Sequence, residues 1–244
     1  MEYPKCVICG KEIQGEFVYD QWGNCACSLH EIENCFSCHR IIGNYSTKSA
    51  RSGKIGFKVE NGRCVCGLCQ ETSVVNNKQI KNSADFVMKL LGKVGFKIIK
   101  ERISIRLISR QDMEAVAPGA EGLCSTSNAN DARLTSSEIF ILSAMPKIKF
   151  ESVLAHELLH WWIFYNGVED GVSVEGFCNI GEALVLNYYA AQKRDDLAIH
   201  LRTEANSSRN FDYGAMFVAQ KAKLNRLGWK AYIDDILTNK KITQ

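Results

Sequence analysis

Apolar residues recur with a helical period over much of the chain, most clearly from residue 149 onward. This pattern predicts helices over roughly residues 149–166, 174–193 and 213–238, each with one buried face. The stretch ADFVMKLLGKVG, residues 84–95, has the same period and ends in glycine, a common residue just after a helix. These segments predict a mainly helical domain.

Two shorter stretches alternate between apolar and polar residues, which is typical of strands. They are RISIRLIS at residues 102–109 and SEIFILSAM at residues 137–145. Between them, PGAEGLCSTSNAND at residues 118–131 is rich in Gly, Ser and Asn, and this composition predicts a loop. The expected fold class is therefore α+β, with a small β-sheet beside the helices.

A polar stretch, ETSVVNNKQIKNS at residues 71–83, separates this helical region from a cysteine-rich one. We expect two domains, at residues 1–75 and 80–244. Nine of the eleven cysteines lie between residues 6 and 69, and the other two are Cys124 and Cys178. The N-terminus lacks the pattern of an export signal, so a reducing, cytoplasmic environment is expected, where such cysteines bind metal rather than form disulfides.

The cysteine-rich region contains an internal repeat. KCVICGKEIQG is echoed by NCFSCHRIIG, and NCACSLH is echoed by RCVCGLC. Each half reads C-x-x-C, a spacer, and then C-x-C-x-x with a final His or Cys. Four such ligands in two close pairs are typical of a closed tetrahedral zinc site. We assign Cys6, Cys9, Cys27 and His30 to one structural zinc ion, and Cys35, Cys38, Cys66 and Cys69 to a second.

This assignment leaves Cys25 and Cys64 over. The spacing also allows Cys35 to join the first site, with His39 or Cys64 completing the second. In every variant the region has few large apolar side chains, so bound metal has to supply part of its folding free energy. Redox pairs are disfavoured because no βαβ pattern surrounds the C-x-x-C motifs.

The charge of the chain excludes some classes of partner. The formal net charge is +3, with no block of Lys or Arg, which disfavours binding to nucleic acid. We find no run of eighteen apolar residues in the sequence, so no membrane partner is expected either.

The segment LAHELLHWW places His156 and His160 four residues apart in a predicted helix. Residues at this spacing share one helix face, so both rings can turn a nitrogen toward the same ion. Glu157 lies beside them, close to the metal without binding it. This is the H-E-x-x-H pattern of zinc peptidases, in which the glutamate is the general base. A histidine pair in a buried helix without a metal is the alternative, but the apolar surroundings make it costly to bury these polar groups uncompensated.

A third protein ligand is expected from the next predicted helix. Glu175, Asn179 and Glu182 follow one another at spacings that put them on one face. Glu175 is the preferred ligand, because 15 residues after His160 leave room for a turn and an antiparallel return. Asn179 would then orient a ligating histidine. Glu182 is the rival ligand on the same stripe.

Two resemblances add to this interpretation. The cysteine-rich region resembles a LIM domain, a two-zinc protein-interaction module, although Ile41 stands where that module has a cysteine. The segments FILSAMPKIKFESVLAHELLHWW and VEGFCN, together with RLISRQDM, EGLC and FDYGAMF, resemble the DA-one-type zinc peptidases of plants, which also carry a LIM domain. The resemblance covers residues 80–240 and implies a gluzincin, with Glu175 as third ligand and Tyr213 in the catalytic cleft.

Taken together, we expect a LIM-like module followed by a zincin-type metallopeptidase domain, with one catalytic and two structural zinc ions. The expected function is a zinc metalloendopeptidase that takes a protein or peptide substrate, lying across an edge strand near Phe140, while the LIM-like module docks a partner. Control by ubiquitin is unsupported by the residues. The alternative is a non-catalytic adaptor in which all the ions are structural.

Overall fold

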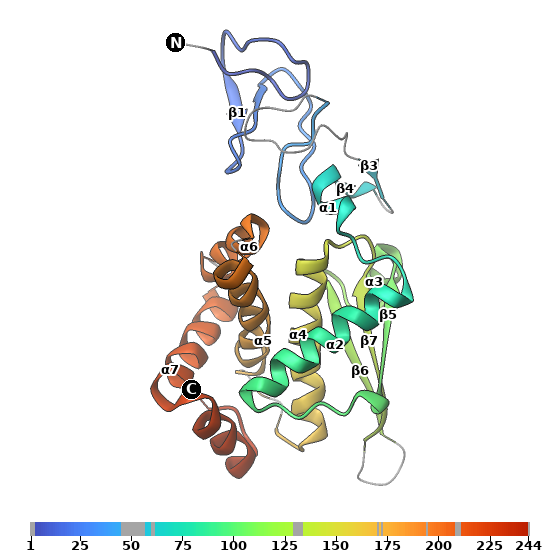
Figure 1. The fold of residues 1–244 in the computed structure, drawn as a ribbon, viewed down its shortest axis with the longest axis vertical. Helices are drawn as coiled ribbons and strands as arrows, with labels where there is room; N and C mark the ends of the chain where they lie inside the picture. Colours follow the sequence, from blue (N-terminus) through green and yellow to red (C-terminus); the bar gives the residue numbers. More distant parts are fainter. Residues whose placement is uncertain are drawn as a thin grey trace. The chain divides into compact units, whose positions relative to one another are not determined.

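The structure is a computed structural model that describes residues 3–44, 57–59, 62–128, 134–169, 171, 173–193, 195–207 and 211–243. The chain is α+β and divides into two compact units (Figure 1). Unit 1 comprises Met1–Val74 with Ser109–Gln111 and Ala144–Pro146. Unit 2 comprises Val75–Ile108, Asp112–Ser143 and Lys147–Gln244. No helix in the described ranges is both long and apolar enough to cross a lipid bilayer.

Unit 1 is built from short hairpins. Strand β1 (Phe17–Tyr19) pairs antiparallel with β2 (Cys25–Cys27), and β3 (Phe57–Lys58) pairs antiparallel with β4 (Cys64–Val65), which leads into helix α1 (Gly67–Glu71). This unit contains a small hydrophobic cluster of five buried residues: Cys6, Val7, Ile13, Ala26 and Ile41. Such a cluster contributes little folding free energy.

The internal repeat of the sequence is also a repeat of backbone structure. In each half, the backbone N–H of the first cysteine closes a tight turn. The backbone N–H of the next residue then donates to the carbonyl oxygen of a later cysteine. The first half has Cys6 N–H to Lys11 O at 2.9 Å and Val7 N–H to Cys25 O at 2.8 Å; the second has Cys35 N–H to Arg40 O at 2.8 Å and Phe36 N–H to Cys64 O at 2.9 Å. The two halves therefore fold alike.

Unit 2 contains a three-stranded sheet in the order β5-β7-β6. Strand β7 (Leu134–Leu142) is central: it runs parallel to β5 (Ile103–Ile108) and antiparallel to β6 (Gly122–Asn128). Phe140 pairs with residues of both neighbours, so the expectation of an edge strand at Phe140 is wrong. The edge beside the later helices is β6, part of the segment expected to be a loop. Pairing with β7 overrides its low strand propensity.

Five longer helices form the rest of unit 2. They are α2 (Asn77–Val94), α4 (Lys147–Tyr165), α5 (Val174–Tyr188), α6 (Asp196–Ser207) and α7 (Phe211–Asn239). Two shorter helices, η2 (Lys100–Arg102) and α3 (Arg110–Val116), flank β5. The last turn of the helix predicted at 174–193 is a π-helix, η3 (Tyr189–Lys193), and α7 is interrupted at Gly228, which has a φ of 72°. Helix α6 was not predicted.

Helix α4 lies at the centre of unit 2. It contacts α5 on one side and the strands β6 and β7 on another, and α2 also packs on it (Figure 1). This explains why its sequence is apolar nearly all round: Leu154, Leu158, Trp161 and Trp162 are all buried. A helix held on several sides gives its polar residues fixed positions.

Glycine brings α5 close to α4. A Cβ atom at Gly181 would lie 2.8 Å from the Ala155 carbonyl oxygen and 2.9 Å from Leu159 Cδ1. Any residue larger than glycine here would push the two helices apart, because the Ala155 carbonyl group belongs to the helix backbone and cannot rotate away as a side chain can. The position of α5 relative to α4 therefore depends on Gly181.

We expect Gly181→Ala to lower the free energy of unfolding by about 1–3 kcal/mol, the usual cost of overpacking. Gly92→Ala is the matched control, because a Cβ at Gly92 in α2 meets nothing within 4 Å. There alanine should stabilise by about 0.5–1 kcal/mol through helix propensity. Urea unfolding of both variants measures the difference. Equal stability of the two variants would contradict the close approach.

Candidate metal centres

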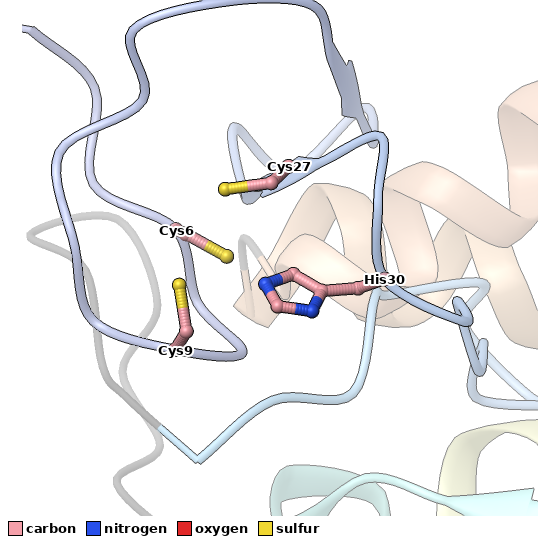
Figure 2. Close-up of side chains that lie close together, drawn as sticks. All are labelled: Cys6, Cys9, Cys27 and His30. Atoms are coloured by element: carbon pink, nitrogen blue, oxygen red, sulfur yellow. The ribbon is translucent and has the colours of Figure 1, made fainter.

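The first cluster of unit 1 brings together the four predicted ligands Cys6, Cys9, Cys27 and His30. Their ligand atoms all lie within 4.8 Å of one another, and Figure 2 shows the three sulfur atoms gathered around the His30 ring. His30 Nε2 is buried and accepts or donates no hydrogen bond within the described residues. Backbone N–H groups of Cys9, Cys27 and Ile8 outweigh burial, which acts the other way, and lower the pKa of Cys6 to about 6. A partly ionised sulfur beside an unsatisfied imidazole suits a metal ion.

The second cluster consists of four buried cysteines, Cys35, Cys38, Cys66 and Cys69. Cys38 Sγ lies 3.6 Å from Cys66 Sγ. Two sulfurs on a tetrahedral zinc ion, each about 2.3 Å from it, would be about 3.8 Å apart. Hydrogen bonds from the other three thiols lower the pKa of Cys35. The donors thus have the number, type and spacing of a Cys₄ zinc site.

The remaining candidates of this region lie outside both clusters. Cys25 Sγ and Cys64 Sγ each lie 3.9 Å from the carbonyl oxygen two residues before them, Gly23 O and Gly62 O. His39 follows Cys38 with a φ of 57°, as Gly10 follows Cys9 with a φ of 74°. His39 is therefore the counterpart of a turn glycine, and the structure groups Cys35 with the second set of ligands.

We expect Cys27→Ser to lower the zinc content of the protein, whereas Cys25→Ser should leave it unchanged. The two residues are neighbours on β2, but only Cys27 belongs to a cluster. Replacing a thiolate ligand removes a strong zinc donor, so folding of unit 1 should also weaken. Inductively coupled plasma mass spectrometry of both purified variants measures bound zinc. A loss with Cys25→Ser would overturn the ligand set.

A third candidate centre lies in unit 2, where three donors converge. His156 Nε2 and His160 Nε2, one turn apart on α4, lie 3.1 Å from each other. Glu175, in the first turn of α5, places one oxygen 3.3 Å from His156 Nε2 and the other 3.4 Å from His160 Nε2. Ligand atoms about 2.0–2.2 Å from a tetrahedral zinc ion would be about 3.3–3.5 Å apart. The three side chains therefore fit one zinc ion.

Charge is also distributed as such a centre requires. Hydrogen bonds from His156 and His160 lower the pKa of Glu175. Burial alone would lower the pKa of His156, but the hydrogen bond to Glu175 and the charges of Glu157 and Glu182 raise it. An ion would replace the protons that these groups otherwise share.

The Glu157 carboxylate lies against strand β6 and is not one of the three converging donors. A Cβ at Gly122 would come within 2.6 Å of Glu157 Oε1, so the strand touches the carboxylate there. Burial raises the pKa of Glu157, an effect opposed by the two histidines and by a hydrogen bond to the Cys124 backbone. A buried carboxylate with a raised pKa, fixed in position by a strand, is suited to accept and return a proton.

The site opens into a cleft of about 890 Å³. One wall is the segment before and within β6, including Pro118, Gly122 and Cys124. The other is formed by α4 and α5 and carries His156, His160, Glu175, Asn179 and Glu182. The three converging donors therefore line an open cleft.

The rival acid, Glu182, lies farther along α5 in the same cleft. Burial raises its pKa, and it forms a hydrogen bond with Ser152. The carboxylate in contact with both ring nitrogens is that of Glu175. The geometry favours Glu175 as the ligand, and Asn179 lies between the two acids on the same helix.

One neighbour was missed by sequence reasoning. The buried sulfur of Cys178 lies within 4.8 Å of ring nitrogens of both His156 and His160. Its position three residues after Glu175 is a helical spacing that could have signalled this. Cys124 lines the cleft, and burial raises its pKa to about 12. The Tyr213 side chain lies outside the described part of the structure.

Comparison with known proteins gives one distant relative. The chain is 22% identical to Protein DA1-related 2 of Arabidopsis thaliana in an alignment that is 223 positions long and covers 70% of this chain. The match spans 41% of the relative's own length. No protein-family model matches the chain, and no solved structure matches it.

Proposed function

We propose that this protein is a zinc-dependent metalloendopeptidase. The observation that carries the proposal is the convergence of His156, His160 and Glu175, with Glu157 beside them in an open cleft. Two imidazoles and one carboxylate leave a coordination position vacant, as in catalytic rather than structural zinc sites. The distant likeness to Protein DA1-related 2 supports the same direction.

The zinc ion would polarise the scissile carbonyl group and lower the pKa of water at the vacant position. The chain's own residues supply the rest. Glu157 accepts a proton from the attacking water and passes it to the leaving amine. Gly122 and the Cys124 backbone keep the Glu157 carboxylate in place. The raised pKa of Glu157 makes it a stronger base and so favours the first of these two proton transfers.

The substrate in this proposal is an extended peptide. Strand β6 is an edge of the sheet and lines the cleft at Gly122 and Cys124. A peptide that adds to this edge would form main-chain hydrogen bonds and pass directly over Glu157. This replaces Phe140, which lies in the central strand, as the reference point for substrate.

A second function, a non-catalytic zinc-stabilised adaptor, is favoured by the position of Cys178. If this sulfur moved onto the ion, it would fill the coordination position that water needs. In the proposed enzyme the Cys178 sulfur stays buried beside the histidines without binding the ion. In either function the two cysteine-rich clusters would hold structural zinc, and we place the protein in the cytoplasm, where such cysteines stay reduced.

Cleavage of a peptide library tests the choice between the two functions. The full chain, loaded with zinc, is incubated with random peptides, and new termini are detected by mass spectrometry. The enzyme should produce cleavage that a chelator abolishes and added zinc restores. The absence of cleavage with one zinc ion bound at each of the three candidate centres would favour the adaptor.

A further inference from the structure

Two donors of different chemical type on α5 lie close to the histidine pair of α4. Glu175 and Cys178 are three residues apart, so they share one face of the helix. The Glu175 oxygens lie 3.3 and 3.4 Å from the ring nitrogens, and the Cys178 sulfur lies within 4.8 Å of a nitrogen in each ring. His156 and His160 can therefore share a metal ion with either donor.

The surroundings of the two donors differ. The Glu175 side chain is 39% exposed and lines the cleft, whereas Cys178 has no exposed surface. Water therefore reaches an ion held by the carboxylate through the cleft, and packing excludes water from the side of the sulfur. The oxygen suits an ion that keeps a water ligand, and the sulfur suits an ion that gives up its water.

The two donors also prefer different ions. Ligand atoms on a tetrahedral zinc ion would be about 3.3–3.5 Å apart, and the Glu175 oxygens have this spacing from the ring nitrogens. Thiolate sulfur, in contrast, selects soft ions. Cd²⁺ is softer and larger than zinc, and its bonds to sulfur are longer. It therefore tolerates a wider separation between the sulfur and the ring nitrogens.

We infer that His156, His160 and Cys178 form an alternative ligand set, which takes a soft metal ion such as Cd²⁺ in place of zinc. Binding breaks the S–H bond of Cys178: the proton leaves to water, and the sulfur donates its electron pair to the ion. Glu175 remains as the fourth donor. The soft ion is then held by four protein atoms and has no position for the water that hydrolysis requires.

Cadmium NMR spectroscopy of the full chain, with Cd²⁺ at all three candidate centres, tests the ligand set. The cadmium chemical shift rises steeply with the number of sulfur ligands, so it reports the donors directly and does not depend on activity. Cys178→Ala should move the resonance of the centre in unit 2 toward the range of nitrogen and oxygen ligands, without moving the two resonances of unit 1. Cys124→Ala is the matched control, because Cys124 lines the same cleft but lies outside the group of three donors, and it should move none of them.

The affinities for the two ions should respond in opposite ways to loss of either donor. Cys178→Ala should weaken Cd²⁺ binding in unit 2 by at least about a hundredfold, more than for loss of a group that only orients a ligand. It should leave zinc binding unchanged, which also shows that the variant folds. Glu175→Ala should weaken zinc more than Cd²⁺, because the sulfur and both imidazoles remain. Competition with a chromophoric chelator too weak to empty the clusters of unit 1 measures both affinities.

The inference rests on the metal centre of the proposed function, but the two can fail separately. If Cys178→Ala leaves the resonance of unit 2 in place, the inference is wrong, and the proposed hydrolysis, which depends on zinc and Glu175, stands. If the variant loses zinc together with Cd²⁺, the inference is also wrong, and the sulfur is a zinc ligand as in the adaptor. If neither ion binds in unit 2, both proposals fail. For an active enzyme, Cd²⁺ should inhibit cleavage, and Cys178→Ala should relieve this inhibition.

Discussion

Replacing Glu157 with Gln should abolish peptide cleavage while leaving bound zinc unchanged. The two side chains have nearly the same shape, and Glu157 is not one of the three converging donors. The amide cannot accept the proton of water, so the rate should fall by about 10²–10⁴-fold, the usual contribution of a general base. Mass-spectrometric detection of new peptide termini measures the rate, and elemental analysis measures the zinc.

Two other outcomes for Glu157→Gln would contradict this prediction in different ways. Full cleavage by Glu157→Gln would refute its role as the base. Lost zinc would instead show that Glu157 is needed to hold the ion. Gln is preferable to Ala at this position because the residue is buried against Gly122, where a smaller side chain would leave a cavity.

Replacing Glu175 with Ala should remove zinc from the centre in unit 2 and leave the clusters of unit 1 occupied. Glu175 places one oxygen near each histidine ring nitrogen, and alanine removes both of these oxygens. Zinc affinity there should fall by at least about a hundredfold, more than for loss of a group that only orients a ligand. Zinc content after dialysis against a weak chelator measures the loss.

Two further variants compare the neighbours of that site. Glu182→Gln should keep the zinc, because the carboxylate in contact with both histidine ring nitrogens is that of Glu175. Cys178→Ala should also keep the zinc and the cleavage activity. If Cys178→Ala loses the zinc instead, the sulfur is a ligand, the vacant position is filled, and the adaptor is the better explanation.

Some of these features were predictable because they depend on residues close together in the chain. The turn between two cysteines in C-x-x-C is local, and the hydrogen bonds after Cys6 and Cys35 repeat it in both halves. The spacing of His156 and His160 fixes their side-by-side position once the helix forms. The helices α2 and α5 follow their apolar periodicity in the same way, whereas α4 is apolar on nearly all sides because it packs between other elements. Helix α6, the shortest of the five longer helices, was not predicted from the sequence.

Other features could not be predicted, because they depend on contacts between residues far apart in the chain. In β6 these contacts also act against a low intrinsic strand propensity. The Gly- and Ser-rich residues of β6 indicated a loop, and only pairing with β7 makes them a strand. That same pairing places Gly122 against Glu157, although 35 residues separate them in the sequence. The edge available to a substrate followed from this pairing and not from the pattern at Phe140.

The sequence by itself determined the candidate chemistry: which residues come in pairs, which pairs share a turn or a helix face, and which metal such donors prefer. Only the tertiary structure placed the Glu175 carboxylate beside both histidine nitrogens, and the Cys178 sulfur close to them. The physical reason is that α5 offers several polar residues at helical spacing, and its rotation and its distance from α4 are fixed by side-chain packing. The contact at Gly181, which no local pattern encodes, sets that distance.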